Sequence, residues 1–143
     1  MLRTLHIETT IPFHFRMIIY ISGIIIHELI HGIFAAVYSP NGFKNVKFGF
    51  SLKSLIAYCY LDELMKVKHF KIVSIMPFII LGIIPLIFGI IIKHAFIIKF
   101  GILFSVGSIG DLIVFYWLCK ENNNYMVKDT GTTKKLEIIV FEE

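Results

Sequence analysis

The chain has 143 residues, of which 57% are hydrophobic, and its mean hydropathy is +0.79. This composition is too apolar for a soluble domain of this size, so it excludes an ordinary soluble enzyme and favours an integral membrane protein. The net charge of +4 comes from lysines that lie beside apolar runs, which argues against a nucleic-acid-binding protein. We expect one membrane-embedded, mainly α-helical domain over residues 1–143.

The beginning of the chain does not have the pattern of a cleavable signal. Residues 1–16 contain Glu8 and Arg16, and the apolar run that follows is too long for the hydrophobic region of a signal peptide. That run, 17–38, is long enough to cross a hydrocarbon core of about 30 Å, and so are residues 70–92 and 100–119. The sequence therefore predicts a multi-pass membrane protein with three transmembrane helices.

Polar residues interrupt the first span at His27, Glu28 and His31, an HExxH pattern. Residues four apart share a helix face, so both imidazoles can bind one metal ion while Glu28 reaches a water molecule on it. Given the histidine and glutamate content, the pattern arises by chance in roughly 1% of shuffled chains. Polar groups in hydrocarbon are costly and are rarely kept without a task. The pattern predicts a zinc site, and the alternative is a polar helix face packed against other helices.

A β-hairpin is predicted after the first span. Residues 39–42 form a turn signal, and the segments 46–50 and 55–60 have the alternation and composition of strands. We expect this hairpin at the cytoplasmic membrane surface, where its edge could pair with an extended peptide or where it could simply connect two spans. Asp62 is then predicted to start the helix that leads into the second span.

Glycine and proline mark the second span, at Pro77, Gly82, Pro85 and Gly89. The prolines predict a kink that frees backbone carbonyl groups, and Gly82, Pro85 and Gly89 share a narrow face on which another helix can approach closely.

The third span carries small residues and a carboxylate, Asp111. A carboxylate near the middle of a span costs about 2.5 to 3.5 kcal/mol, so Asp111 needs a partner, and a cation would supply one. The tail after Glu121 is polar and ends in the strand-like segment 136–141, which together predict a short cytoplasmic hairpin. Cys59 and Cys119 form neither a disulfide framework nor a CxxC pair.

The distribution of basic residues predicts an orientation in the cell membrane. The loop 39–71 and the tail after Cys119 hold ten lysines, whereas the opposite ends of the spans hold Arg3, Arg16, Lys93 and Lys99. By the positive-inside rule, the large loop and the C-terminus are cytoplasmic and the N-terminus is outside. Three spans agree with termini on opposite sides.

A catalytic zinc ion usually has three protein ligands, so His27 and His31 need a third. His31 lies about 7 residues from the cytoplasmic end of its span and Asp111 about 8 residues from the end of its own, so both are roughly 10 to 12 Å deep. Three other histidines, His6, His14 and His94, lie at the opposite ends of the spans. We favour Asp111 as the third ligand, and His69 at the start of the second span remains the alternative.

The ordered elements HELIHG, AYCY, Met76-Pro77-Phe78 and Gly110-Asp111 resemble the putative zincin peptidase family of bacterial membrane proteins. That family is similar to site-2 proteases, which are intramembrane metalloproteases. The resemblance implies that His27, His31 and Asp111 bind Zn²⁺ and that Glu28 is the catalytic base. Glycine precedes the aspartate here, whereas site-2 proteases typically have an Asp-Gly order after an Asn and Pro motif.

The leading hypothesis is a zinc-dependent, membrane-embedded peptidase that hydrolyses a peptide bond in a membrane-associated protein, with the lipid bilayer and that substrate as partners and no nucleic acid. A second hypothesis is a non-catalytic membrane protein whose zinc site is structural or vestigial and which serves as an interaction module. A third, a metal transporter subunit, has few pathway carboxylates to support it beyond Glu28 and Asp111. The presence of Glu28 favours the enzyme, because a structural zinc site needs no base.

Overall fold

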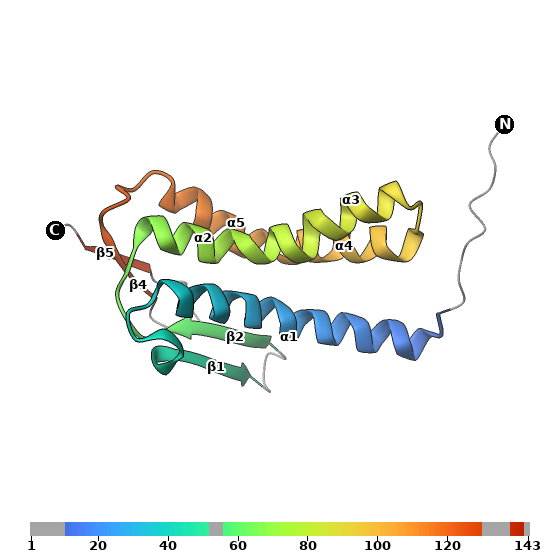
Figure 1. Cartoon of the computed structure of the whole chain (residues 1–143), viewed down its shortest axis with the longest axis horizontal. Helices are drawn as coiled ribbons and strands as arrows, with labels where there is room; N and C mark the ends of the chain where they lie inside the picture. The colour runs from blue at the N-terminus through green and yellow to red at the C-terminus, as the bar shows by residue number, and fades with distance from the viewer. Residues whose placement is uncertain (1–10, 52–55, 130–137, 142–143) are drawn as a thin grey trace.

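The computed structural model in Figure 1 describes residues 11–51, 56–129 and 138–141, and the first ten residues, including His6 and Arg3, lie outside the described part. Helix α1 and a β-hairpin form one side of the molecule, and two paired helical rods form the other. The elements are α1 (Phe13–Tyr38), η1 (Gly42–Asn45), β1 (Val46–Ser51), β2 (Ile56–Leu61), β3 (Met65–Lys66), α2 (Val67–Pro77), η2 (Phe78–Ile83), α3 (Ile84–Ile91), α4 (Ala95–Gly107), α5 (Ile109–Leu118), β4 (Met126–Asp129) and β5 (Ile138–Phe141).

Two helical segments are long and apolar enough to cross a membrane. They are α1, with 26 residues, and the continuous rod Val67–Ile91, with 25. Helices α4 and α5 qualify as a third segment only if they count together, because the chain bends by 49° between them. The prediction of a mainly helical protein with about three spans is therefore confirmed at the level of two or three candidate spans. Insertion into a membrane and orientation stay predictions.

The kink predicted in the second span stays a prediction, and the structure has one turn of wider helix at that place. Residues 78–83 of η2 form a π-helix between α2 and α3, next to Pro77 and Pro85. Neither proline has a backbone N–H group to donate. The predicted close approach is present. A Cβ atom on Gly82 would lie 2.5 Å from the Ser105 hydroxyl oxygen, and one on Gly89 would lie 2.8 Å from the backbone nitrogen of Ile98. The glycines therefore let α4 pack against the backbone of the helical segment Val67–Ile91.

The third span differs from the straight helix expected over residues 100–119. It begins earlier, at Ala95, and is broken at Ser108 into α4 and α5. The buried Ser108 hydroxyl donates a hydrogen bond to the Phe104 carbonyl group at 2.9 Å, a side-chain contact that bends helices. Gly107 and Gly110 flank the break and weaken the helix there, and neither has a neighbour within 4 Å of its Cβ position. The break makes Asp111 part of the first turn of a new helix.

The predicted hairpin is confirmed, with Val46 opposite Leu61 and Phe48 opposite Cys59. It does not project beyond the end of α1 but lies alongside its C-terminal half, as Figure 1 shows. The ring of Phe48 lies against Gly32, so that a Cβ atom there would be 2.2 Å from it. The position of the hairpin relative to a membrane surface stays a prediction.

A polar clamp holds the ends of the hairpin to the end of α1. The Glu63 carboxylate accepts hydrogen bonds from the Ser39 hydroxyl and from the Asn41 side-chain amide. These hydrogen bonds, first that of Ser39, lower the pKa of Glu63. Loop residues on both sides of the hairpin are thereby joined, which fixes the strands along α1.

The helix predicted to start at Asp62 begins five residues later, at Val67, and Met65 and Lys66 form strand β3 instead. The cause is the C-terminal tail. Strand β4 pairs with β3 on one side and with β5 on the other, giving a three-stranded sheet where a two-stranded hairpin was expected. The free N–H group of Val67 donates to the Tyr125 carbonyl at 2.9 Å, so the tail caps α2.

Candidate metal centre

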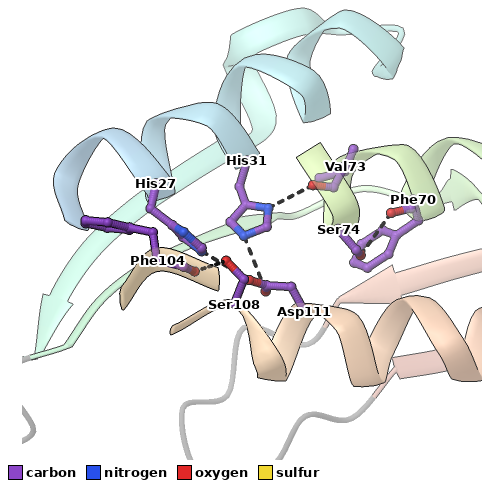
Figure 2. Close-up of polar contacts among 8 residues, drawn as sticks. All are labelled: His27, His31, Phe70, Val73, Ser74, Phe104, Ser108 and Asp111. Atoms are coloured by element: carbon purple, nitrogen blue, oxygen red, sulfur yellow. Dashed lines mark hydrogen bonds and ion pairs between the residues drawn. The ribbon is translucent and has the colours of Figure 1, made fainter. Parts of the chain in front are cut away.

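Three side chains from two distant segments converge between α1 and α5. Figure 2 shows His27 and His31 of α1 and Asp111 of α5 pointing toward one another. The His27 Nε2 atom lies 3.1 Å from Asp111 Oδ2, and His31 Nε2 lies 3.3 Å from Asp111 Oδ1. One potential ligand atom from each residue lies within 4.8 Å of the other two. In the part of the chain that the structure describes, this is the one group of three or more His, Cys, Asp or Glu residues so arranged.

The orientation of the His31 ring leaves its Nε2 atom available to a cation. Its Nδ1 atom lies 2.9 Å from the Val73 carbonyl oxygen, which can only accept, so Nδ1 must carry the proton (Figure 2). In the neutral ring Nε2 then presents a lone pair toward the Asp111 carboxylate. A lone pair and a carboxylate attract each other only when a proton or a metal ion lies between them. The Val73 carbonyl group therefore fixes the orientation of the His31 ring, as a hydrogen-bond acceptor commonly does for a histidine that binds a metal ion.

Local packing brings Asp111 to α1. The ring of the buried Phe104 lies against Gly23, one helical turn before His27, and a Cβ atom at Gly23 would be 2.3 Å from it. Helix α4 can therefore approach α1 closely at this level. Just beyond, the bend at Ser108 starts α5, whose N-terminal N–H groups favour a carboxylate such as that of Asp111.

Glu28 lies beside this group and lines the same cavity. The cavity has a volume of about 310 Å³, and Glu28, His31 and Asp111 are at its polar part. The Glu28 carboxylate interacts with the backbone N–H of Cys59 in β2. Further lining comes from β2, α2, α5 and β4, through Ala57, Tyr58, Cys59, Tyr60, Leu61, Phe70, Val73, Ser74, Val114 and Asp129.

The edge of β2 forms one wall of the cavity. Five consecutive residues, 57–61, line it, although successive side chains of a strand point to opposite faces, so backbone as well as side chains face the cavity. The N–H of Cys59 points toward Glu28 and away from β1. Ladder hydrogen bonds alternate along a strand, so the backbone groups of Ala57 and Leu61 point the same way.

The donor set fits zinc. Two imidazole nitrogens and one carboxylate oxygen are the ligands of many catalytic zinc sites, with a fourth position left for water. Around a tetrahedral ion with bonds of 2.0 to 2.1 Å, neighbouring ligand atoms are about 3.3 Å apart. The two His–Asp separations of 3.1 and 3.3 Å are of this size, although each involves a different oxygen of the Asp111 carboxylate. With one ligand atom from each residue within 4.8 Å of the other two, His27, His31 and Asp111 could hold Zn²⁺.

The other histidines that the structure describes lie away from the site. The ring of His69, the rival third ligand, stacks on Tyr38 with a centroid distance of 4.5 Å. His94 precedes α4 at the far end of the helical rods, and His14 packs beside Phe15 near the start of α1. The geometry thus favours Asp111 over His69 as the third ligand. The comparison of depths along the spans favours the same residue.

Sequence reasoning missed three contributors to the site: the Val73 carbonyl group, the β2 edge at Cys59, and Asp129. None carries a pattern of its own. Every residue has a backbone carbonyl group, so the sequence does not indicate which one contacts a site. Asp129 precedes Thr130 and Gly131, and this short sequence is typical of a turn. Burial, then the charges of Glu28 and Asp129, raise the pKa of the Cys59 thiol to about 12, so this thiol stays protonated at neutral pH.

Comparison with known proteins gives one match. A family model described as a putative zincin peptidase matches residues 20–126, which include all of HExxH and Asp111. No curated protein and no solved structure matches the chain. The matched region begins within α1 and ends at the first residue of β4.

Proposed function

The chain belongs to the family of putative zincin peptidases, and from that premise we propose that it is a zinc-dependent peptidase that works inside or against the membrane. Its substrate is a membrane-associated protein. The observation that carries this proposal is that His27, His31 and Asp111 converge within 4.8 Å of one another while Glu28 lines the same cavity.

In this proposal His27, His31 and Asp111 hold the zinc ion. Zinc in such a site supplies a Lewis acid that polarises a carbonyl group and makes water acidic enough to react near neutral pH. Glu28 takes the proton from the attacking water and then delivers it to the nitrogen of the leaving amine. The Val73 carbonyl keeps the His31 ring in place. Outward-facing backbone groups of β2 offer an extended peptide hydrogen bonds beside Glu28.

Metal content and peptide cleavage of the purified chain in detergent test the proposal. We expect His27→Ala and Asp111→Ala to lose zinc and activity together. Glu28→Gln should keep zinc and lose activity by about 10² to 10⁴-fold, the usual contribution of a general base. His69→Ala is the matched control, because its ring stacks on Tyr38 away from the site, and it should keep both.

The results separate the peptidase from the non-catalytic alternative. Zinc bound by the wild type with no cleavage in any variant would leave a structural zinc site. Full cleavage activity in Glu28→Gln would exclude Glu28 as the base. A wild type that binds no zinc when supplied with it would contradict the metal centre itself.

We also propose that the protein resides in the cell membrane with its N-terminus outside and the large loop and C-terminus in the cytoplasm, as the lysine distribution indicates. Cys119 provides a native probe, because it is exposed at the end of α5. In a Cys59→Ala background, a membrane-impermeant maleimide should label Cys119 in permeabilised cells and not in intact ones. Labelling in intact cells would reverse the orientation.

A further inference from the structure

The cavity beside the metal centre has an apolar wall that the proposed chemistry does not use. Leu61, Phe70 and Val114 form this wall, and they come from three different elements, β2, α2 and α5. Glu28 and Asp111 belong to the polar part of the same cavity. Zinc binding and proton transfer involve only that polar part, so the apolar wall has no role in them.

Two helices place the apolar wall one turn from the metal centre. On α5, Val114 follows Asp111 by three residues, so the two side chains share a helix face. On α2, Phe70 precedes Val73, the hydrogen-bond partner of His31, by three residues, and both line the cavity. The two helices run in opposite directions (Figure 1), so both steps lead toward the same end of the cavity.

Packing holds the apolar wall in place. Val114 belongs to a cluster of buried residues, and Phe70 packs against that cluster. Phe70 also packs against a second cluster, to which the buried Leu61 belongs. Close-packed side chains have little freedom to rearrange, so this part of the cavity has a definite shape.

The size of the cavity suits one apolar side chain beside the cleaved bond. Its volume of about 310 Å³ gives room for roughly ten groups the size of a water molecule, at about 30 Å³ each. A peptide group together with one leucine or phenylalanine side chain is of that size. With the peptide group beside Glu28 and Asp111, an adjoining side chain of the substrate reaches Val114.

We propose that Leu61, Phe70 and Val114 form a subsite for a leucine-sized or phenylalanine-sized side chain of the substrate, next to the cleaved peptide bond. This inference rests on the proposed peptidase function. Removing such a side chain from water favours binding, whereas a charged side chain would lose its hydration against this wall. Val114 sets the largest side chain that fits, because it is the wall residue on the same helix as Asp111 and one turn from it.

The residues preferred beside the cleaved bond test the subsite. The zinc-loaded full chain in detergent is incubated with a mixed-sequence peptide library, and mass spectrometry gives the residues on either side of each cleaved bond. We expect leucine and phenylalanine to be enriched about tenfold over glycine and alanine at one of the two adjoining positions, as a matching apolar pocket can achieve.

Substitutions of Val114 should shift this preference in opposite directions. Val114→Phe fills the subsite, so glycine and alanine should be preferred over leucine by about tenfold. Val114→Ala enlarges the subsite, so phenylalanine and tryptophan should gain over leucine. Val114→Ile adds a single methylene group and disturbs the core least, and it should disfavour phenylalanine while leucine is still accepted. Opposite shifts do not result from a loss of stability, which affects all peptides alike.

Ile113→Phe is the matched control, because Ile113 precedes Val114 on α5 but is exposed and does not line the cavity. It should leave the preference unchanged. The zinc content of every variant should equal that of the wild type, because neither residue is a proposed ligand.

Two single peptides give the same test as rate constants. For Val114→Phe, kcat/KM should fall about tenfold on a peptide with leucine at the preferred position and should not fall on one with alanine there. A variant that is only less stable would lose activity on both peptides in the same proportion.

The failure of this inference differs from the failure of the proposed function. A wild type that cleaves library peptides with no preference for apolar residues, or Val114→Ala and Val114→Ile variants with the wild-type preference, overturns the subsite and leaves the peptidase standing. A zinc-loaded wild type that cleaves no peptide overturns both.

Discussion

The two ends of the paired helical rods are built differently. At the end formed by α3 and α4, the helices touch through glycine: a Cβ atom on Gly101 would lie 2.6 Å from the backbone nitrogen of Leu86, and one on Gly89 would be similarly close to Ile98. At the end formed by α2 and α5, larger residues and two small sheets surround a cavity of about 310 Å³. The first end is closely packed through its glycines, whereas the second contains the cavity and also holds the polar groups.

This difference teaches how a small apolar chain can keep polar groups inside. Close contact of α3 and α4 gains van der Waals packing, which is the main force between helices in lipid. The broken helix at Ser108 and the strands then hold α1, α2 and α5 around Glu28, His31 and Asp111 without filling the space between them. We infer that the closed end supplies stability and the open end chemistry, and three substitutions test this division.

The largest expected effect is at the closed end. Gly89→Leu forces a side chain into the backbone of Ile97 and Ile98, which cannot move away as a side chain could. We expect the free energy of unfolding to fall by about 3 kcal/mol, the upper range for overpacking. Thermal unfolding in detergent measures it. Gly107→Leu is the control, because Gly107 has no neighbour within 4 Å of its Cβ position and should tolerate the change. Equal losses in both variants would contradict the division.

A smaller effect on the free energy of unfolding is expected where α1 contacts α4, between the two ends of the rods. Gly23→Ala pushes against the buried ring of Phe104 and should cost about 1 to 3 kcal/mol, partly offset by the better helix propensity of alanine. Because Phe104 lies one turn before the bend that positions Asp111, zinc affinity should fall as well.

Gly32→Ala is the matched comparison, since it meets the ring of Phe48, which is 51% exposed and can turn outward. Its stability and zinc content should stay near those of the wild type. Zinc affinity that is unchanged in Gly23→Ala would show that the contact with Phe104 does not position the site.

The smallest effect concerns the polar clamp at the open end. Hydrogen bonds from Ser39 and Asn41 lower the pKa of Glu63, so the folded state favours its charged form. This contribution to stability is present above the pKa of Glu63 in the unfolded chain and is lost as the pH falls through its lower pKa in the folded one. The wild type should unfold at a slightly higher temperature than Glu63→Gln at neutral pH, and the difference should vanish as the pH falls below the ordinary pKa of glutamate and then through the lower pKa of folded Glu63. A difference that is independent of pH would rule out the carboxylate as its source.

Part of the site was predictable because it depends on short-range geometry. The helix repeat alone puts His27 and His31 on one face, with Glu28 beside them, and counting residues from the span ends brought Asp111 to the same depth. The proximity that this counting predicts is confirmed by the 3.1 and 3.3 Å distances to Asp111, although the role of these residues as ligands stays a prediction. Gly82 and Gly89 likewise indicated the close helix approach that the structure contains.

One error occurred where a distant segment overrides a local signal, and the other where a side chain within the segment bends its own helix. Asp62 has the composition of a helix start, but the free N–H groups at the start of α2 are satisfied by carbonyl groups of the tail, so the helix begins at Val67. The segment 100–119 is apolar enough for a straight span, but the Ser108 hydroxyl bonds back to Phe104 and the helix bends. In the first case the partner lies far along the chain, and in the second the hydropathy of the segment does not reveal the hydrogen bond that bends it.

The sequence by itself determined the helical, membrane-type character of the chain and the HExxH face, because hydropathy and helical repeat act over neighbouring residues. Only the tertiary structure decided that the hairpin folds back along α1, that Val73 orients His31, and that β4 brings Asp129 into the cavity wall. These features depend on backbone groups and on contacts between segments far apart in the chain. Such contacts arise from the packing of the whole molecule, and no single stretch of sequence specifies them.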